Sequence, residues 1–149
     1  MNFLLSFEEY LKKGIVKKHS PDILRSRSLV EESKRKEVFL NKIIKKIGID
    51  KENANDIIEI CYDLIVNLIR SKMLLKGFSS TGKGTHEAEI SYLRKFNFSE
   101  EEVSFANQLR YFRNGILYYG KRFDEGYAKL VLKFLRKVRE GLKNENIYK

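Results

Sequence analysis

Two segments of the chain carry residue types that could bind phosphate, and the first is LKGFSSTGKGTHEA, residues 75–88. From Gly77 to Lys83 it reads G-x-x-x-x-G-K, which is the spacing of a nucleotide-binding P-loop. The next position, where a P-loop has Ser or Thr to hold Mg²⁺, is Gly84, and Thr85 comes one residue late. A P-loop also follows a β-strand, whereas this segment follows the most apolar predicted helix. We therefore interpret it as a flexible connection between helices.

An anion site without a P-loop remains open in the same segment. Thr85 and His86 lie where the sequence predicts a helix N-terminus, whose free N–H groups and dipole favour anions. Lys83 and the hydroxyls of residues 79–81 would add donors. The alternative is that Thr85 is a helix cap and His86 an exposed residue of the first turn.

The second segment is RYFRNGILYYG, residues 110–120, near the end of a predicted helix. One side of that helix carries polar side chains at i, i+3, i+4 and i+8, namely Arg110, Arg113, Asn114 and Tyr118. Two arginines beside an apolar stripe are costly unless they are paired or bind something. They either tie one helix to another or form a phosphate or nucleotide clamp, for which the forked donors of arginine are suited.

Composition limits the classes of function that remain. The net charge of +10 favours polyanions such as RNA, DNA or an acidic protein, although lysine also serves solubility alone. Glu8 and Glu9 interrupt the apolar start, and no apolar run is as long as a membrane span, so we expect a cytoplasmic protein. With Cys61 as the single cysteine and only His19 and His86 beside it, we expect no disulfide, no metal site and no cofactor.

Helical periodicity extends along most of the chain, with glycine at the breaks. The predicted helices begin at Ser6, Pro21, Asp50, Thr85, Ser99 and Asp124 and end near Gly14, Gly48, Gly77, Phe96, Gly120 and Leu142. No stretch alternates with a period of two for long enough to predict a strand. The predicted fold is all-α, an up-and-down four-helix bundle with one or two additional short helices. We expect one domain, 1–149, with a short helix and basic linker (1–19), a bundle core (20–142) and a tail (143–149).

The chain resembles the HEPN family (higher eukaryotes and prokaryotes nucleotide-binding domain) over most of residues 20–142, and the two segments described above carry the resemblance. RNGILYYG is similar to the family's Arg-Asn-x-x-x-His stretch, and LLKGFSSTGKGTHEAEISYL is similar to its central helix, glycine and following short segment. The resemblance implies a small helical domain that dimerises through this motif. Many members are metal-independent RNases, often toxins, and many are encoded beside a nucleotidyltransferase that acts as their partner.

The chain departs from the family at the motif histidine. Active members have Arg, four to six residues and then His, and Arg113 matches that Arg, with Asn114 after it. The corresponding His positions hold Tyr118, Tyr119 and Gly120, and counting from Arg110 gives Gly115, Ile116 and Leu117. Since His titrates near 6.5 and Tyr near 10, an unperturbed Tyr is a poor general base. His86 could replace the missing group only if the fold brings it near Arg113.

The sequence therefore favours a dimeric HEPN-like helical domain that binds a nucleotide, an RNA or a nucleotidyltransferase, with weak or no nuclease activity. It would be the HEPN half of a toxin–antitoxin pair if that partner exists. Two alternatives remain open: a metal-independent RNase toxin that uses Arg113 with Tyr118 or His86, and a non-catalytic dimeric interaction module. The expected binding residues are Arg110, Arg113, Asn114, Tyr118, Lys83 and His86.

Overall fold

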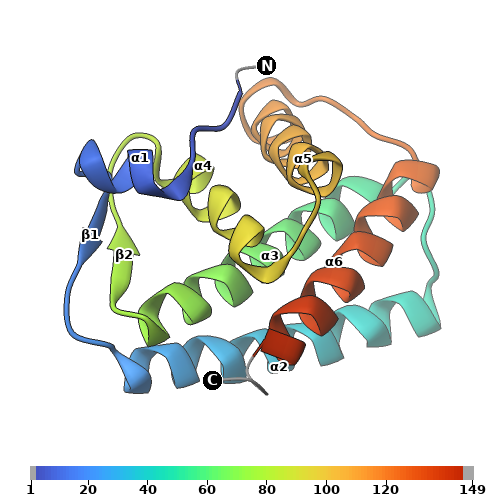
Figure 1. Cartoon of the computed structure of the whole chain (residues 1–149). Coiled ribbons are helices and arrows are strands. Elements are labelled where there is room, and N and C mark those ends of the chain that lie inside the picture. Colours follow the sequence, from blue (N-terminus) through green and yellow to red (C-terminus); the bar gives the residue numbers. More distant parts are fainter. Residues whose placement is uncertain (1–2, 146–149) are drawn as a thin grey trace.

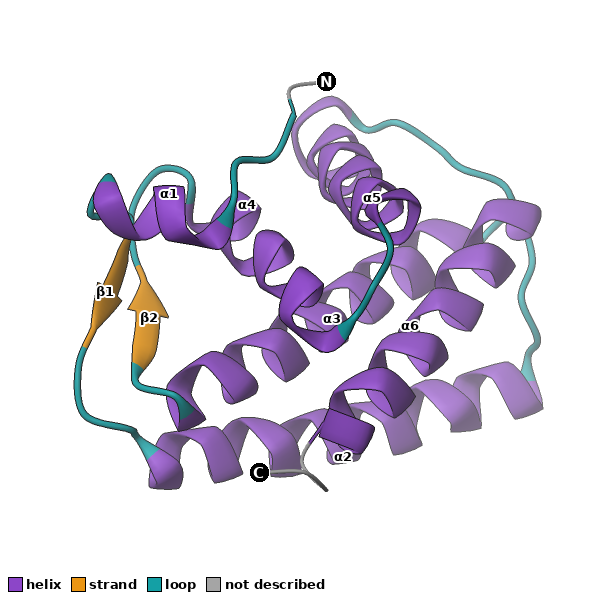
Figure 2. Ribbon diagram, viewed as in Figure 1, coloured by secondary structure: helices purple, strands orange, loops and turns teal. Residues whose placement is uncertain are grey.

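Long helices dominate the protein, and α3 lies at their centre (Figures 1 and 2). The computed structural model describes residues 3–145. Helices α2 (Ile23–Lys46) and α6 (Glu125–Glu145) pack along α3 (Ala54–Leu75), and α5 (Glu100–Tyr119) lies across its other side. The expectation of a mostly helical fold is confirmed. The up-and-down four-helix bundle is not confirmed, because the backbone of α5 lies mainly against α3 and the short helix α4 (Thr85–Ser91).

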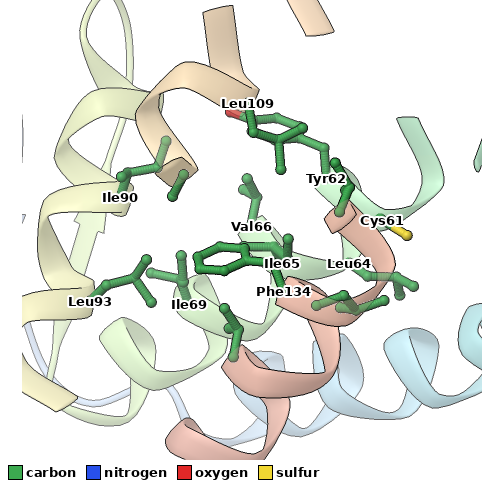
Figure 3. Close-up of a cluster of buried hydrophobic side chains, with 14 of the residues drawn as sticks. Cys61, Tyr62, Leu64, Ile65, Val66, Ile69, Ile90, Leu93, Leu109 and Phe134 are labelled. Carbon is green, nitrogen blue, oxygen red and sulfur yellow. The ribbon is translucent and has the colours of Figure 1, made fainter. Parts of the chain in front are cut away.

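The core shown in Figure 3 forms where four elements meet around α3. Figure 3 shows side chains of α3 facing Ile90 of α4, Leu93 of the 3₁₀ helix η1 (Tyr92–Phe96), Leu109 of α5 and Phe134 of α6. All four of these residues are buried. Burying a side chain of this size contributes roughly 1.5–3 kcal/mol. Four separate elements therefore each bury apolar side chains against one central helix.

Several helix ends lie where local capping signals predict them. The Ser99 hydroxyl oxygen accepts a hydrogen bond from the Glu102 backbone N–H, and the Glu102 carboxylate accepts one from the Ser99 backbone N–H, so the predicted capping box at the start of α5 is confirmed. Gly120 ends α5 in the left-handed conformation. A second capping box, between Ser6 and Glu9, starts helix α1 (Phe7–Lys12).

The predicted starts of α2 and α3 are too early. Helix α2 begins at Ile23 and not at Pro21, because Asp22 is its cap: the Asp22 carboxylate accepts a hydrogen bond from the Arg25 backbone N–H. Helix α3 begins at Ala54, because Asp50 instead accepts backbone hydrogen bonds within the preceding turn. The start of α2 is therefore two residues later than predicted, and the start of α3 is four residues later.

The expectation that the chain has no strands is wrong. Strand β1 (Val16–Lys18) pairs antiparallel with β2 (Phe78–Ser80), with Val16 opposite Ser80 and Lys18 opposite Phe78 (Figure 2). Neither strand is long enough to show alternation, and the partner of each lies far away in the sequence. The pairing attaches the N-terminal segment to the rest of the protein, and Phe7, Tyr10 and Val16 are buried in the core.

The strand β2 also changes the account of the glycine-rich segment. A P-loop has its strand before the first glycine, whereas β2 follows Gly77, so the topology still differs from that of a P-loop. Thr85 is the first residue of α4 and not its N-cap, because Gly84 occupies that position. The Thr85 hydroxyl donates to the Gly82 carbonyl oxygen at 2.7 Å and so closes the turn before the helix.

Helix α6 runs to Glu145, beyond the predicted end near Leu142, and the remainder of the predicted tail lies outside the described residues. Within residues 3–145, no helix combines the length and apolar character that crossing a membrane requires.

Gly77 generates a test of this fold. Its φ is +80°, and a Cβ there would lie 2.1 Å from the backbone oxygen of His19. Gly77→Ala combines left-handed strain with a collision against main chain, so we expect it to lower the free energy of unfolding by about 2 kcal/mol or more in urea denaturation. Gly82→Ala is the matched control, because Gly82 has a φ of +82° but open space around it. Equal losses in the two variants would contradict the close approach at His19.

Candidate functional site

Arg113 ties α5 to α3. Its Nη2 lies 3.2 Å from Asp63 Oδ1, and the centre of its guanidinium lies 5.3 Å from the centroid of the Tyr62 ring. Its Nε is buried and has no hydrogen-bond partner among the described residues. The geometry combines an ion pair with a cation–π contact, for which a planar guanidinium is suited. Of the two interpretations of Arg113 in the sequence, the structure supports the tie between helices.

His86 lies against the same tyrosine. Its Nδ1 is 3.4 Å from the Tyr62 hydroxyl oxygen and 3.7 Å from Glu89 Oε1, and the His86 and Tyr62 ring centroids are 6.1 Å apart. The fold therefore brings His86 from α4 and Arg113 from α5 to one side chain of α3. The imidazole is 46% exposed, so part of the ring faces solvent.

Glu89 fixes the position of α4 on α3. Its side chain is 1% exposed and accepts two hydrogen bonds from Arg70, at 2.6 Å from Nε and 3.1 Å from Nη2. A buried carboxylate requires such a partner, and the bidentate arrangement fixes both side chains. The hydrogen bond to Glu89 raises the pKa of Arg70, while its partial burial opposes the shift. Glu89 is thereby held beside the His86 ring.

The Tyr62 hydroxyl keeps its proton at neutral pH. Burial raises the pKa of Tyr62 well above its ordinary value, and the nearby charges of Arg113 and Arg110 oppose this shift only in part. Tyr62 is therefore a hydrogen-bond partner and not a general base. For His86 to accept a proton at Nε2, its Nδ1 must keep its own proton, which then points toward the Tyr62 oxygen and Glu89.

A cleft of about 590 Å³ is lined by residues of α1, α4 and α5. Lys13, Lys83 and Arg110 reach it from three separate segments, and Tyr111, which is 57% exposed, lies at its edge. The described residues that line it are Phe3, Leu4, Leu5, Tyr10, Lys13, Ile15, Lys83, Gly84, Glu87, Arg110 and Tyr111. This cleft brings together one cation from each of the two segments that the sequence analysis singled out.

The charges in this cleft are only partly balanced. Arg110 donates from Nε to Asn107 Oδ1 at 3.0 Å, and its Nη1 lies 3.9 Å from Glu87 Oε1. Glu87 is the one carboxylate among the described residues of the lining. Lys13 and Lys83 are exposed and form no ion pair within residues 3–145. The cleft therefore has a surplus of positive charge.

The remaining predicted residues lie apart from these contacts. Tyr118 is 73% exposed near the end of α5, and Asn114 is half-buried. Neither forms a side-chain hydrogen bond with another described residue. The predicted face of α5 is thus divided, with Arg110 in the cleft, Arg113 against Tyr62, and Tyr118 directed to solvent.

Sequence analysis missed Tyr62, Asp63, Arg70 and Glu89, which hold the predicted residues in place. A signal was present, because Asp63 and Arg70 are charged residues on the most apolar helix of the chain. Cys61, beside them, is buried, and burial raises the pKa of its thiol to about 12. It is a core residue, as expected from its place in the apolar stripe.

No protein-family model matches the chain, and no curated protein and no solved structure is significantly similar to it. The HEPN resemblance therefore rests on the sequence motifs alone.

The contrast between Glu89 and Glu87 gives a test of this arrangement. Glu89→Gln leaves the Arg70 guanidinium without its buried counter-charge, so we expect it to lower the free energy of unfolding by about 2 kcal/mol. Glu87→Gln, at a carboxylate that is 37% exposed and 3.9 Å from Arg110, should cost less than about 0.5 kcal/mol. Urea denaturation of both variants measures the difference. A similar small loss in the two would show that the Arg70–Glu89 pair does not hold α4 in place.

Proposed function

We propose that this protein is an HEPN-like binding domain that holds RNA, or a nucleotide, by its phosphate in the cleft formed by Lys13, Lys83 and Arg110. One observation carries the proposal: three cations from three separate segments converge on one cleft that has a single carboxylate among its described lining residues. Lysine and arginine are the usual protein partners of phosphate oxygens. The net charge of +10 adds long-range attraction for a polyanion.

Tyr111 supplies the second element of the proposed contact. Its side chain is 57% exposed at the edge of the cleft, and it is adjacent in sequence to Arg110. Aromatic rings beside cationic grooves stack on nucleobases without requiring a particular base. Phosphate at the cations and a base on Tyr111 would together favour single-stranded RNA over an inorganic anion.

The homodimer expected from the HEPN resemblance would use the end of α5. Leu117 is 46% exposed, Tyr118 73% and Tyr119 81%, so this end of the helix presents apolar surface to solvent. Such exposed apolar groups are typical of surfaces that contact another protein. A nucleotidyltransferase, the other partner that the resemblance implies, would compete for the same end of the helix.

Charge reversal in the cleft tests the binding proposal. We expect Lys83→Glu to weaken binding of a labelled single-stranded RNA by about tenfold and to flatten the dependence of affinity on salt, because a phosphate contact is lost. Lys129→Glu is the matched control, since Lys129 is an exposed residue of α6 outside the cleft. Fluorescence anisotropy at several salt concentrations measures both. Equal weakening in the two variants would reduce the proposal to non-specific attraction by net charge.

A second candidate function is RNA cleavage, and it is favoured by the contact of His86 and Arg113 with the same tyrosine. In this reaction the imidazole would take the proton of a ribose 2′-hydroxyl, whose oxygen then attacks the adjacent phosphorus. The 5′-oxygen leaves and takes a proton from water, and the imidazolium returns its proton to the solvent. Arg113 would stabilise the charge on the phosphorane oxygens. Asp63 holds Arg113 at 3.2 Å, so Arg113 has to share its donors with the phosphate.

Incubation with labelled RNA in the presence of EDTA tests this second function. If His86 and Arg113 cleave RNA, the wild-type protein produces fragments, and His86→Ala and Arg113→Lys each reduce the rate by at least about a hundredfold. Tyr118→Phe should leave the rate unchanged, because Tyr118 is 73% exposed and forms no hydrogen bond with another described residue. Loss of cleavage in Tyr118→Phe alone would identify Tyr118 as the base instead. No cleavage by the wild-type protein would leave binding as the function.

A further inference from the structure

A second cleft, of about 660 Å³, lies on the other side of α1 from the Lys13 cleft. It opens between the two-stranded sheet, the C-terminal end of α3 and η1, and no residue lines both clefts. The described residues around it are Phe7, Glu8, Leu11, Lys18, Lys72, Leu75, Lys76, Phe78, Tyr92, Lys95 and Phe96. Lysine and aromatic residues thus make up most of its lining.

The charge of this cleft is positive even after its ion pair is counted. Lys95 pairs with Glu8, and the hydrogen bond from Lys95 lowers the pKa of that carboxyl, which keeps Glu8 ionised at neutral pH. Lys18 and Lys76 are exposed and have no carboxylate partner among the described residues. The Lys18 ammonium lies 5.8 Å from the centroid of the Phe78 ring. Two amines are therefore available to an anion at the rim.

The floor of the cleft is aromatic. Phe78 contacts Phe7 with ring centroids 5.2 Å apart, and Phe96 contacts Tyr92 at 5.5 Å, both edge to face. Phe78 and Phe96 are half-buried, and Leu75 beside them is 36% exposed. These groups leave apolar surface uncovered inside the cleft, where a flat apolar group of a ligand would exclude water from it.

Compensation of the α3 dipole accounts for only part of this arrangement. Lysine near a helix C-terminus is favourable by itself, and Lys76 is the C-cap residue of α3. Lys95 is accounted for by its ion pair with Glu8, but Lys18 belongs to β1, which has no such role at the end of α3. The convergence of the Lys18 and Lys76 amines from two separate elements over an aromatic floor requires a different explanation.

We propose that this cleft binds a nucleotide, with the phosphate between Lys18 and Lys76 and the base against the aromatic floor. Lysine binds phosphate as a point charge and aromatic side chains bind nucleobases by their faces and edges. The inference goes beyond the function proposed above and is independent of it, because the two clefts share no lining residue.

Titration of the full chain with AMP tests the proposal, with binding measured by isothermal titration calorimetry or by NMR chemical shifts. We expect Lys18→Glu and Lys76→Glu each to weaken AMP binding by about tenfold, which corresponds to the loss of one favourable phosphate contact. Lys129→Glu, on the exposed side of α6, should leave the affinity unchanged within about twofold. Circular dichroism of each variant confirms that the helices persist.

The other outcomes separate this proposal from the first. Weakening in Lys83→Glu but not in Lys18→Glu or Lys76→Glu would place AMP in the Lys13 cleft and overturn the second site. Equal weakening in Lys129→Glu would also overturn the second site, because the protein would then attract AMP only by its net charge. Ribose 5-phosphate is the test of the aromatic floor: binding as tight as that of AMP would show that the base makes no contact. No binding of AMP at all would reject the nucleotide, whatever the RNA experiment shows.

Discussion

The arrangement of the protein follows from the need to cover α3. This helix is apolar around most of its circumference, and its buried residues include Ile57, Ile58, Leu64, Ile65 and Ile69. Because exposure of such a surface is costly, α2, α6, α4 and α5 all have to pack against it. The few charged groups of α3 then lie at the edges of these contacts, where Asp63 meets α5 and Arg70 meets α4. The polar contacts around Tyr62 are thus a consequence of how the core closes.

Several arginines connect separate elements of this structure. Arg70 and Arg113 are paired with carboxylates of other helices, and Arg94 binds both Glu100 and the Leu5 carbonyl oxygen. These pairs connect elements that are distant in the sequence, and a planar guanidinium with several donors is suited to that task. Other cations remain outside such pairs at both proposed binding clefts. They are Lys13 and Lys83 in the first cleft and Lys18 and Lys76 in the second, and none of them pairs with a carboxylate of the described residues.

Sequence reasoning succeeded where the determining interaction is local. The Ser99–Glu102 capping box and the left-handed Gly120 involve residues within one or two helical turns, so their spacing alone identifies them. It failed where the partner is distant: nothing near Val16 indicates that it will pair with Ser80, and nothing near His86 indicates that Tyr62 will lie beside it. The candidate residues could be named from their chemistry, but their grouping depends on how α4 and α5 pack on α3.

The fold brings the two segments that resemble phosphate sites together at two places. Lys83 precedes His86 by three residues, and Arg110 precedes Arg113 by three, which is close to one helical turn in α5. Lys83 and Arg110 meet in the cleft, and His86 and Arg113 meet at Tyr62. In the first pair, Arg110 lies 3.9 Å from Glu87 and Lys83 forms no ion pair with a described residue, whereas in the second pair Arg113 lies 3.2 Å from Asp63. Binding of an anion is therefore easiest at the first pair, whereas at the second pair Arg113 has to share its donors between Asp63 and the substrate.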